Sequence, residues 1–398
     1  MPRLRYVRAT RLRWMRILFS FVGGRGHFDP MAPVARALAA HGHTVAVAGG
    51  GSHVPALAKA GFTTFAVNEP REVEATRQPM PPVDPARDDW EIRELFARRA
   101  TREHVPVLLE LAREWRPDLI VRDEVDFSAA LAAEVLGLPC ATVLVLAAGT
   151  LLRKELLAEP LAEARAAHGL PDDPELEMLT RGQVLSPLPP SFRDPSAPLP
   201  PGTFSFRQGD PVAPRRPAGK PHVYFTLGTN FNLESGDLIE RTLAGLGRLD
   251  AEVTATVGTQ IDPAEFGPQP AHVRVERFVP QAELLPRLDL MISHAGSGSV
   301  IGALSHGLPS LLFPMGADQP GNARRCVALN VGRALDPETS TPDEICQAAA
   351  AMLADPSYRA AAQRVQAEIN ALPAAEAAVP VLEALVTSSA SGSFPPAP

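Results

Sequence analysis

The strongest constraint on the fold of this chain is a repeated alternation of short apolar runs with helical segments. Within residues 15–49, an apolar run at Ile17–Val22 ends in glycines, a helical segment follows, and a second apolar run occupies His43–Ala48. The same order recurs over residues 117–146. Continuous apolar runs are typical of buried parallel strands, and their alternation with helices predicts a parallel sheet that helices cover.

The first helix carries its own start and stop signals. Asp29 followed by Pro30 predicts an N-cap and a first-turn proline, Val34 and Leu38 share one helix face, and Gly42 ends the helix. We therefore expect this helix to begin at Asp29.

The alternation stops at a proline-rich segment and then resumes. Eleven prolines lie in residues 187–221, whereas strand-like runs alternate with helices again from Val223 to Met315. A chain of 398 residues is long enough for two domains of about 150 to 200 residues each. The fold class that we predict is α/β, with two Rossmann-like parallel α/β domains that face each other across a cleft.

The expected domain boundaries follow the composition. Residues 68–90, rich in Pro, Glu and Arg, are predicted to form a mobile polar loop. The boundaries that we predict are 15–195 for the N-terminal domain, 196–221 for the linker, 222–372 for the C-terminal domain, 373–388 for a helix that packs back on the N-terminal domain, and 389–398 for a disordered tail.

Composition restricts the partners of the chain. With 45% hydrophobic residues, 21% charged residues and a net charge of −7, it gives no reason to expect nucleic acid as a partner. No run of about 18 apolar residues occurs, so we expect no stable membrane insertion. Cys140, Cys326 and Cys346 form no metal-ligand or disulfide pattern, which favours a cytoplasmic protein without a metal.

Polar residues follow two apolar runs of the N-terminal half, where ligands bind in open parallel sheets. His27 lies in the glycine turn after the first run, and Asp123 follows the run at Leu119. A histidine there suits a general base, and a carboxylate could fix its tautomer and stabilise its positive charge. The alternatives are helix capping or solvent exposure for His27, and N-capping of the next helix for Asp123.

The glycines before His27 also suggest a dinucleotide-binding turn, as in an oxidoreductase. Two observations oppose it. Asp29 stands where GxGxxG needs its third glycine, and the second apolar run ends in "VAVAGGG" without an acid for a ribose.

In the C-terminal half, "HAGSGS" (residues 294–299) lies between an apolar run and a helix. Glycines allow close approach of a ligand, and a helix start offers free N–H groups and positive potential, so this turn can bind a diphosphate without a metal. His294, Ser299 and Thr229 could add side-chain donors. Alternatively, the small residues only let the strand pack against the helix.

Two further turns carry candidate ligand contacts. Phe278 in "RFVPQAELL" could stack on a base, although a phenylalanine at a strand end is more often a core residue. Asp318 in "GADQPGNA" could accept hydrogen bonds from sugar hydroxyls, or it could cap a helix.

Together, "GGRGHFDP", "VRDE", "FVPQ…HAGSGS" and "GADQPGNA" resemble, in this order, the motifs of family 1 glycosyltransferases, the UDP-glycosyltransferase superfamily with the GT-B fold. The resemblance covers nearly the whole chain. It implies an inverting transferase without cofactor or metal, whose N-terminal domain binds the acceptor and whose C-terminal domain binds the nucleotide sugar.

The resemblance also assigns residues. It makes His27 the base and Asp123 its partner, and it gives the sugar to Asp318 and Gln319. It assigns nucleotide or diphosphate contacts to Thr229, Phe278, Val279, Gln281, His294, Gly296, Ser297, Gly298 and Ser299.

Two departures from the plant enzymes point to a branch of the family. Phe278 replaces a base-stacking tryptophan, and Gly302 stands where an acid binds ribose hydroxyls. Both resemble the bacterial antibiotic-tailoring enzymes and indicate a dTDP-deoxysugar donor, because dTDP lacks the ribose 2′-hydroxyl. The expected acceptor is a hydroxyl of a hydrophobic natural product such as a polyketide, enediyne or macrolide. Two other functions remain alternatives: a UDP-sugar transferase acting on a sterol or lipid, and a non-catalytic nucleotide-sugar-binding partner. Both a monomer and a homodimer fit the sequence.

Overall fold

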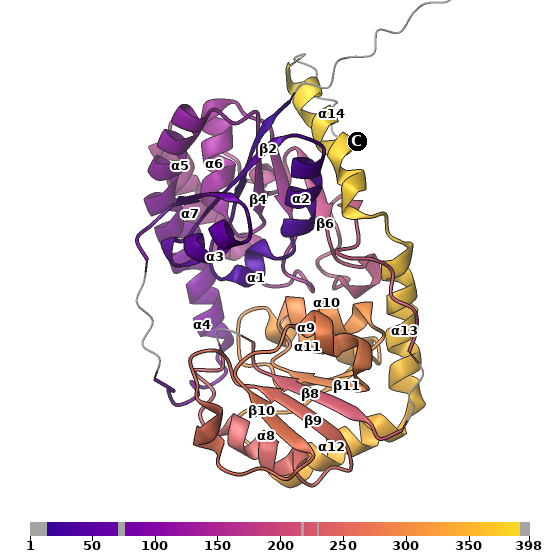
Figure 1. Cartoon of the computed structure of the whole chain (residues 1–398). Helices are drawn as coiled ribbons and strands as arrows, with labels where there is room; N and C mark the ends of the chain where they lie inside the picture. The colour runs from indigo at the N-terminus through magenta and orange to yellow at the C-terminus, as the bar shows by residue number, and fades with distance from the viewer. Residues whose placement is uncertain (1–13, 71–75, 216–218, 229–230, 391–398) are drawn as a thin grey trace, which may run out of the picture.

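The computed structural model describes residues 14–70, 76–215, 219–228 and 231–390. Two α/β halves lie one above the other, and the C-terminal helices return along one side from the lower half to the upper (Figure 1). Within the described ranges, no helix is long and apolar enough to cross a membrane.

The N-terminal half is built on a seven-stranded parallel sheet in the order β3-β2-β1-β4-β5-β6-β7. Its strands are β1 (Arg16–Ser20), β2 (Thr44–Gly49), β3 (Thr63–Ala66), β4 (Leu119–Asp123), β5 (Cys140–Val143), β6 (Gln183–Ser186) and β7 (Phe204–Ser205). Its helices are α1 (Arg25–Phe28), α2 (Ala32–Ala40), α3 (Val54–Lys59), α4 (Pro85–Trp90), a π-helix (Glu91–Ala100), α5 (Thr101–Trp115), α6 (Phe127–Leu136) and α7 (Lys154–Ala167).

The C-terminal half repeats the plan with a six-stranded parallel sheet in the order β10-β9-β8-β11-β12-β13. Its strands are β8 (His222–Thr226), β9 (Glu252–Thr256), β10 (Val273–Glu276), β11 (Leu290–Ser293), β12 (Ser310–Leu312) and β13 (Gly332–Ala334). Its helices are α8 (Leu238–Leu246), α9 (Gln281–Leu284), α10 (Ser297–Ser305), α11 (Gln319–Ala328), α12 (Pro342–Ala354) and α13 (Pro356–Ala371), and α14 (Ala378–Ala390) follows. The predicted α/β class with two parallel sheets is confirmed.

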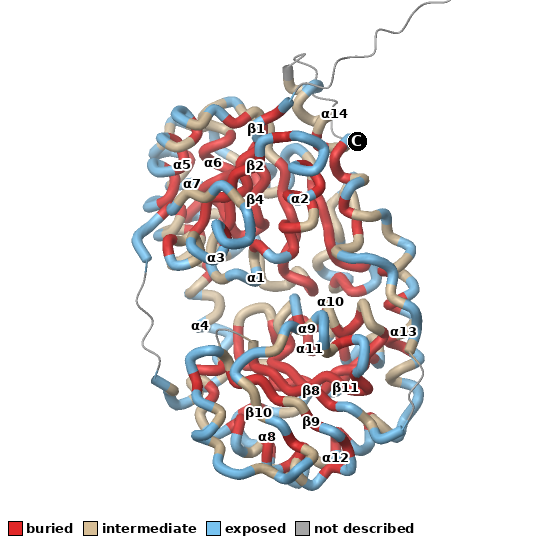
Figure 2. The backbone as a smooth tube through the Cα atoms, viewed as in Figure 1, coloured by how far each residue is buried: buried red, intermediate tan, exposed pale blue. Residues whose placement is uncertain are grey.

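Each sheet is buried between layers of helices, as the red segments inside both halves show (Figure 2). The apolar runs that predicted β1 and β4 supply Ile17, Phe19 and Leu119, which are fully buried in one core. Ala378 and Leu382 of α14 belong to the same core, so the last helix packs on the N-terminal half. Parallel strands buried on both faces explain why these runs are continuously apolar.

Two local predictions need correction. The first long helix, α2, begins at Ala32 rather than at Asp29, because the short helix α1 comes first and Asp29 is its C-cap. Residues 68–90 are not one loop, since α4 begins at Pro85 after the N-cap Asp84. Residues 71–75 lie outside the described ranges.

The segment at Arg77 and Gln78 connects the N-terminal half to the C-terminal half. Arg77 pairs with Glu240 of α8, with the Nη1–Oε1 atoms 2.7 Å apart. The backbone N–H of Gln78 donates to the carbonyl of Leu233 at 2.7 Å. Strand β7 lies within the segment predicted as the linker and extends the N-terminal sheet past residue 195. The boundaries proposed from composition stay predictions.

Candidate active site

His27 lies on α1, directly after β1, and Asp123 is the last residue of the neighbouring strand β4. The parallel pairing of these strands brings both residues to one edge of the sheet. His27 Nδ1 is 3.5 Å from Asp123 Oδ2, and the side chains are 23% and 0% exposed. The structure therefore joins two residues that lie far apart in the sequence.

The Asp123 carboxylate is fixed by backbone N–H groups. Oδ2 accepts from Val22 at 2.9 Å, and Oδ1 accepts from Val125 at 2.5 Å and from Asp126 at 3.0 Å. The N-cap of α6 is Asp126, whose side chain accepts from the N–H of Ala129. The capping alternative for Asp123 is therefore wrong, and its carboxylate is held toward His27.

Three carboxylates act on His27. Burial lowers the pKa of its imidazole, but the charges of Asp123, Asp318 and Glu124 outweigh that effect, so the pKa is raised. Asp318 belongs to the C-terminal half. Both halves thus favour a positive charge at this histidine.

The glycine turn before α1 leaves room for the ring. Gly23 has φ of 85°, and a Cβ there would lie 3.1 Å from His27 Nε2. A side chain at position 23 would be strained and would crowd the nitrogen that does not face Asp123.

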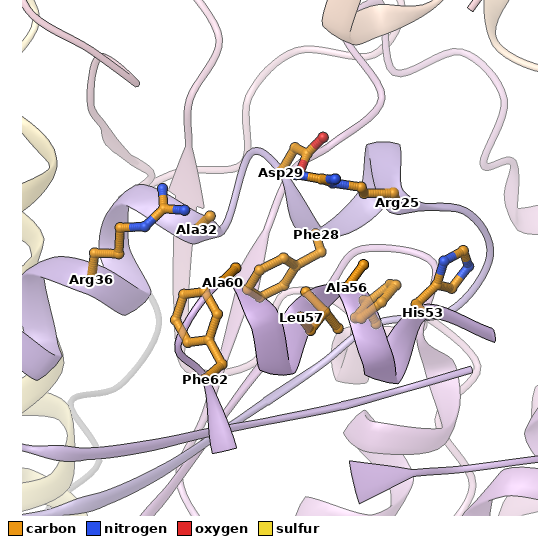
Figure 3. Close-up of a pocket in the computed structure, with 11 residues that line it drawn as sticks. Arg25, Phe28, Asp29, Ala32, Arg36, His53, Ala56, Leu57, Ala60 and Phe62 are labelled. Carbon is orange, nitrogen blue, oxygen red and sulfur yellow. The ribbon is translucent and has the colours of Figure 1, made fainter. Parts of the chain in front are cut away.

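The back of α1 borders a small cavity of about 30 Å³. Phe28, Leu57 and Phe62 form its apolar wall, while Arg25 and Asp29 lie at one side (Figure 3). A cavity of this volume suits ordered water rather than a sugar or an acceptor.

The predicted diphosphate turn connects β11 to α10, on the side of the lower half that faces α1 (Figure 1). Gly296 is the N-cap of α10. The first backbone N–H groups of a helix have no partner within it, so those of Ser297, Gly298 and Ser299 are available to an anion. A Cβ at Gly298 would meet no atom within 4 Å, which leaves open space over the helix start.

His294 is buried at this turn, with the centroid of its ring 5.8 Å from that of Phe231. A Cβ would lie 2.7 Å from His294 Cε1 if added at Gly228, and 2.5 Å from Nε2 if added at Gly296. Burial lowers the pKa of His294 to about 4. The two glycines therefore admit a neutral imidazole, which explains the small residues better than strand–helix packing alone. The neighbouring candidate Thr229 lies outside the described residues.

Asp318 and Ser297 are bonded to each other. Ser297 Oγ donates to Asp318 Oδ2 at 2.5 Å and accepts from the N–H of Ala147, in the N-terminal half, at 2.6 Å. The Ser297 hydroxyl is thus committed to protein groups, and only its backbone N–H is free for an anion. Asp318 is the N-cap residue of α11, as the capping alternative predicted, but its side chain makes no capping hydrogen bond and is bonded to Ser297 and Asn322 instead.

The other predicted contacts differ in their freedom to bind. Gln319 is 1% exposed, and its Oε1 accepts from the N–H of Met315, so its carbonyl is already used. Ser299 is 8% exposed. Phe278 is 62% exposed after β10, so it is no core residue and its ring is free to stack.

Val279 and Gln281 follow Phe278 and are half-buried. A Cβ at Gly302 would lie 3.7 Å from Gln281 Oε1 and 3.5 Å from Leu285 Cδ1. Both distances are ordinary contacts, so the fold has room for a Cβ at position 302.

Sequence reasoning missed Asn322. This residue is fully buried on α11, where it contacts both Asp318 and the N-terminal half. Its position four residues after Asp318 placed it on the same helix face, a signal that the motif "GADQPGNA" contained.

The chain is similar to known proteins over most of its length. The N-terminal and C-terminal domain models of the erythromycin biosynthesis protein CIII-like family match residues 36–197 and 240–385. L-demethylnoviosyl transferase of Streptomyces niveus is 30% identical over 369 residues, which cover 89% of this chain and 94% of that protein. The chain belongs to this family. It is therefore a glycosyltransferase, as the motifs predicted.

The similarity to other named proteins and to solved structures extends over nearly the whole chain. Tylactone mycaminosyltransferase of Streptomyces fradiae is 29% identical and covers 96% of this chain and 95% of its own length. The crystal structure of the glycosyltransferase VinC with dTDP has a TM-score of 0.73 at 26% identity, covering 94% of this chain and all of VinC. Spinosyn rhamnosyltransferase SpnG with thymidine diphosphate has a TM-score of 0.77 at 26% identity, covering 93% of this chain and all of SpnG. The GT-B fold is confirmed.

Proposed function

We propose that this glycosyltransferase moves a deoxysugar from dTDP to a hydroxyl of a hydrophobic natural product, with inversion at the anomeric carbon and without a metal. The observation that carries the proposal is the contact between His27 and Asp123, opposite Asp318 and the start of α10.

The base is His27. Asp123 Oδ2 favours the tautomer with the proton on Nδ1, which leaves Nε2 unprotonated and able to take the proton of the acceptor hydroxyl. As that proton moves to Nε2, the acceptor oxygen bonds to the anomeric carbon and the carbon–oxygen bond to the diphosphate breaks. The carboxylates around His27 stabilise the imidazolium that forms.

The leaving diphosphate takes the electron pair of the broken bond. The backbone N–H groups at the start of α10 would stabilise its charge, and the neutral His294 below the turn avoids a cation that could hold the product too tightly. Asp318 and Gln319 would contact the sugar, and Phe278, Val279 and Gln281 the base.

The dTDP preference rests on Gly302. No acid is present there to bind a ribose 2′-hydroxyl, although a Cβ at this position would make only ordinary contacts. The names of relatives agree with this preference, since they include a TDP-daunosamine transferase of Streptomyces peucetius and the two thymidine-nucleotide complexes. The acceptor class is supported in the same way by relatives named for tylactone, 10-deoxymethynolide and aclacinomycin.

Binding calorimetry with dTDP, UDP, dTDP-glucose and UDP-glucose tests the donor. We expect tighter binding of dTDP than of UDP, in the presence of EDTA as well as of Mg²⁺. Preference for UDP would refute the donor assignment, and binding that requires Mg²⁺ would refute the metal-free diphosphate site.

A further inference from the structure

Asn322 connects the two halves of the enzyme at the donor site. Its Oδ1 accepts from the backbone N–H of Ala148 at 2.9 Å, across the boundary between the halves. Its Nδ2 donates to Asp318 Oδ2 at 2.7 Å and to the carbonyl of Ala295 at 3.0 Å. One side-chain amide therefore contacts the N-terminal half, the sugar-contact candidate and the diphosphate turn.

The geometry of an amide makes these contacts interdependent. The oxygen and the nitrogen lie in one plane, so a bond that fixes Oδ1 also fixes the direction of the Nδ2 donors. When the N–H of Ala148 donates to Oδ1 of Asn322, the Nδ2 group of Asn322 therefore points at Asp318. Ser297 makes a parallel connection, because its hydroxyl accepts from Ala147 and donates to Asp318.

The docking loop at Ala147 and Ala148 is itself held by the catalytic edge of the N-terminal sheet. Glu124, the residue after Asp123, accepts from the N–H groups of Val145 and Leu146 at 2.5 Å each. The loop is therefore held next to Asp123, the partner of the base His27. Through its contact with Asn322, the same loop connects His27 and Asp123 to the donor site in the C-terminal half.

We propose that Asn322 is a positioning residue that orients the Asp318 carboxylate toward the donor sugar only when the N-terminal half is docked. This role rests on the proposed sugar contact of Asp318. In this proposal Asn322 does not contact the substrate itself. Its amide links the contact between the two halves to recognition of the sugar rather than of the nucleotide.

Calorimetry with dTDP and dTDP-glucose separates sugar recognition from nucleotide binding. In Asn322→Ala we expect dTDP affinity to stay within about twofold of the wild type, while the gain in affinity from the glucosyl group falls about 10- to 100-fold, as for loss of a hydrogen bond to a charged group. Asp318→Ala should lose the same gain in affinity from the glucosyl group. The double variant Asn322→Ala/Asp318→Ala should lose no more of this gain than either single variant does.

Asn370→Ala is the matched control. Asn370 also uses both ends of its amide, on the backbone of Val212 at 3.1 and 2.9 Å, but it lies away from Asp318. We expect this variant to bind both ligands as the wild type does.

Asn322→Asp distinguishes positioning from a purely structural role. The new carboxyl keeps the acceptor for Ala148 but faces Asp318, so the two carboxylates share a raised pKa. At a pH below this pKa, the two carboxylates share a proton, which restores a hydrogen-bond donor toward Asp318. At a pH above this pKa, both carboxylates are charged and repel each other. Sugar discrimination relative to the wild type should therefore recover as the pH falls. This readout also serves if Asn322→Ala does not fold.

The failures are distinguishable. If Asp318→Ala keeps the glucosyl gain, the proposed sugar contact is wrong, and the role of Asn322 with it. If Asp318→Ala loses the gain but Asn322→Ala keeps it, or if Asn322→Asp shows no recovery at lower pH, only the positioning role is overturned.

Discussion

A histidine follows a parallel strand in each half, and the two have opposite pKa shifts. His27 and His294 each follow a strand at the edge where the halves meet, and a glycine leaves room for each ring where an added Cβ would crowd it. Carboxylates raise the pKa of His27 despite its burial, whereas burial alone lowers that of His294 to about 4. Neighbouring charge, rather than position in the fold, therefore decides which histidine suits proton transfer and which stays neutral beside an anion.

Removal of the first histidine is expected to give the largest effect. His27→Ala should lower the rate of sugar transfer by about 10² to 10⁴-fold, the usual contribution of a general base. Its dTDP affinity should be unchanged, because the diphosphate site belongs to the other half. A transfer assay with an accepted aglycone and calorimetry with dTDP measure the two quantities. The exposed His41, the C-cap of α2, provides a histidine-to-alanine control, and near-normal transfer by His27→Ala would refute the role of His27 as the base.

Removal of the carboxylate from His27 should make it resemble His294. In Asp123→Asn, burial becomes the dominant influence, so the pKa of His27 should fall below its ordinary value. Activity requires the unprotonated base, so the acid limb of the pH–rate profile should move to lower pH, while the maximal rate falls at least about 10-fold because the imidazolium loses its partner. An unmoved limb with a stable fold, checked by thermal unfolding, would contradict this account.

The sequence predicted the edge of the N-terminal sheet that carries His27 and Asp123, because each strand and turn there is encoded by a short stretch of neighbouring residues. An apolar run ends, a glycine turn follows, and parallel strands bring His27 and Asp123 to one edge. The role of each residue remains a prediction. The N-cap prediction at Asp29 failed because a four-residue helix, α1, has too few residues to show a period.

The donor edge was less predictable because its contacts join distant segments. The bonds of Ser297 to Ala147 and of Asn322 to Ala148 span 150 and 174 residues, and they depend on how the two halves dock. No local pattern encodes docking. The motif located the turn, but it could not show that the Ser297 hydroxyl faces Asp318 instead of an anion.

Crowding of the second histidine should give a smaller effect, on binding alone. In Gly296→Ala the new methyl group meets His294 Nε2 at 2.5 Å, so the ring or the turn must shift, and we expect dTDP affinity to fall about 10-fold, the change expected when a well-placed hydrogen bond is lost. Gly298→Ala is the matched variant in the same turn. Its methyl group meets no protein atom within 4 Å, so the unliganded protein should gain about 0.5–1 kcal/mol of stability from the lost glycine flexibility. Equal dTDP affinity of Gly296→Ala and the wild type would place the diphosphate elsewhere.

The smallest expected effect is on the pH dependence of stability, where the two histidines should act with opposite signs. The pKa of His294 is lowered to about 4 from 6.5, so the unfolded chain takes up a proton between pH 6.5 and pH 4 that the native ring refuses. This histidine therefore destabilises the native protein progressively as the pH falls through that window. The raised pKa of His27 stabilises the native protein at low pH, and that contribution is lost as the pH rises through the pKa of the folded protein.

Thermal unfolding from pH 7 to pH 5 measures both effects. The stability of His294→Asn relative to the wild type should increase as the pH falls, and that of His27→Asn should decrease. The same sign for both variants would mean that neighbouring charge does not separate the two sites.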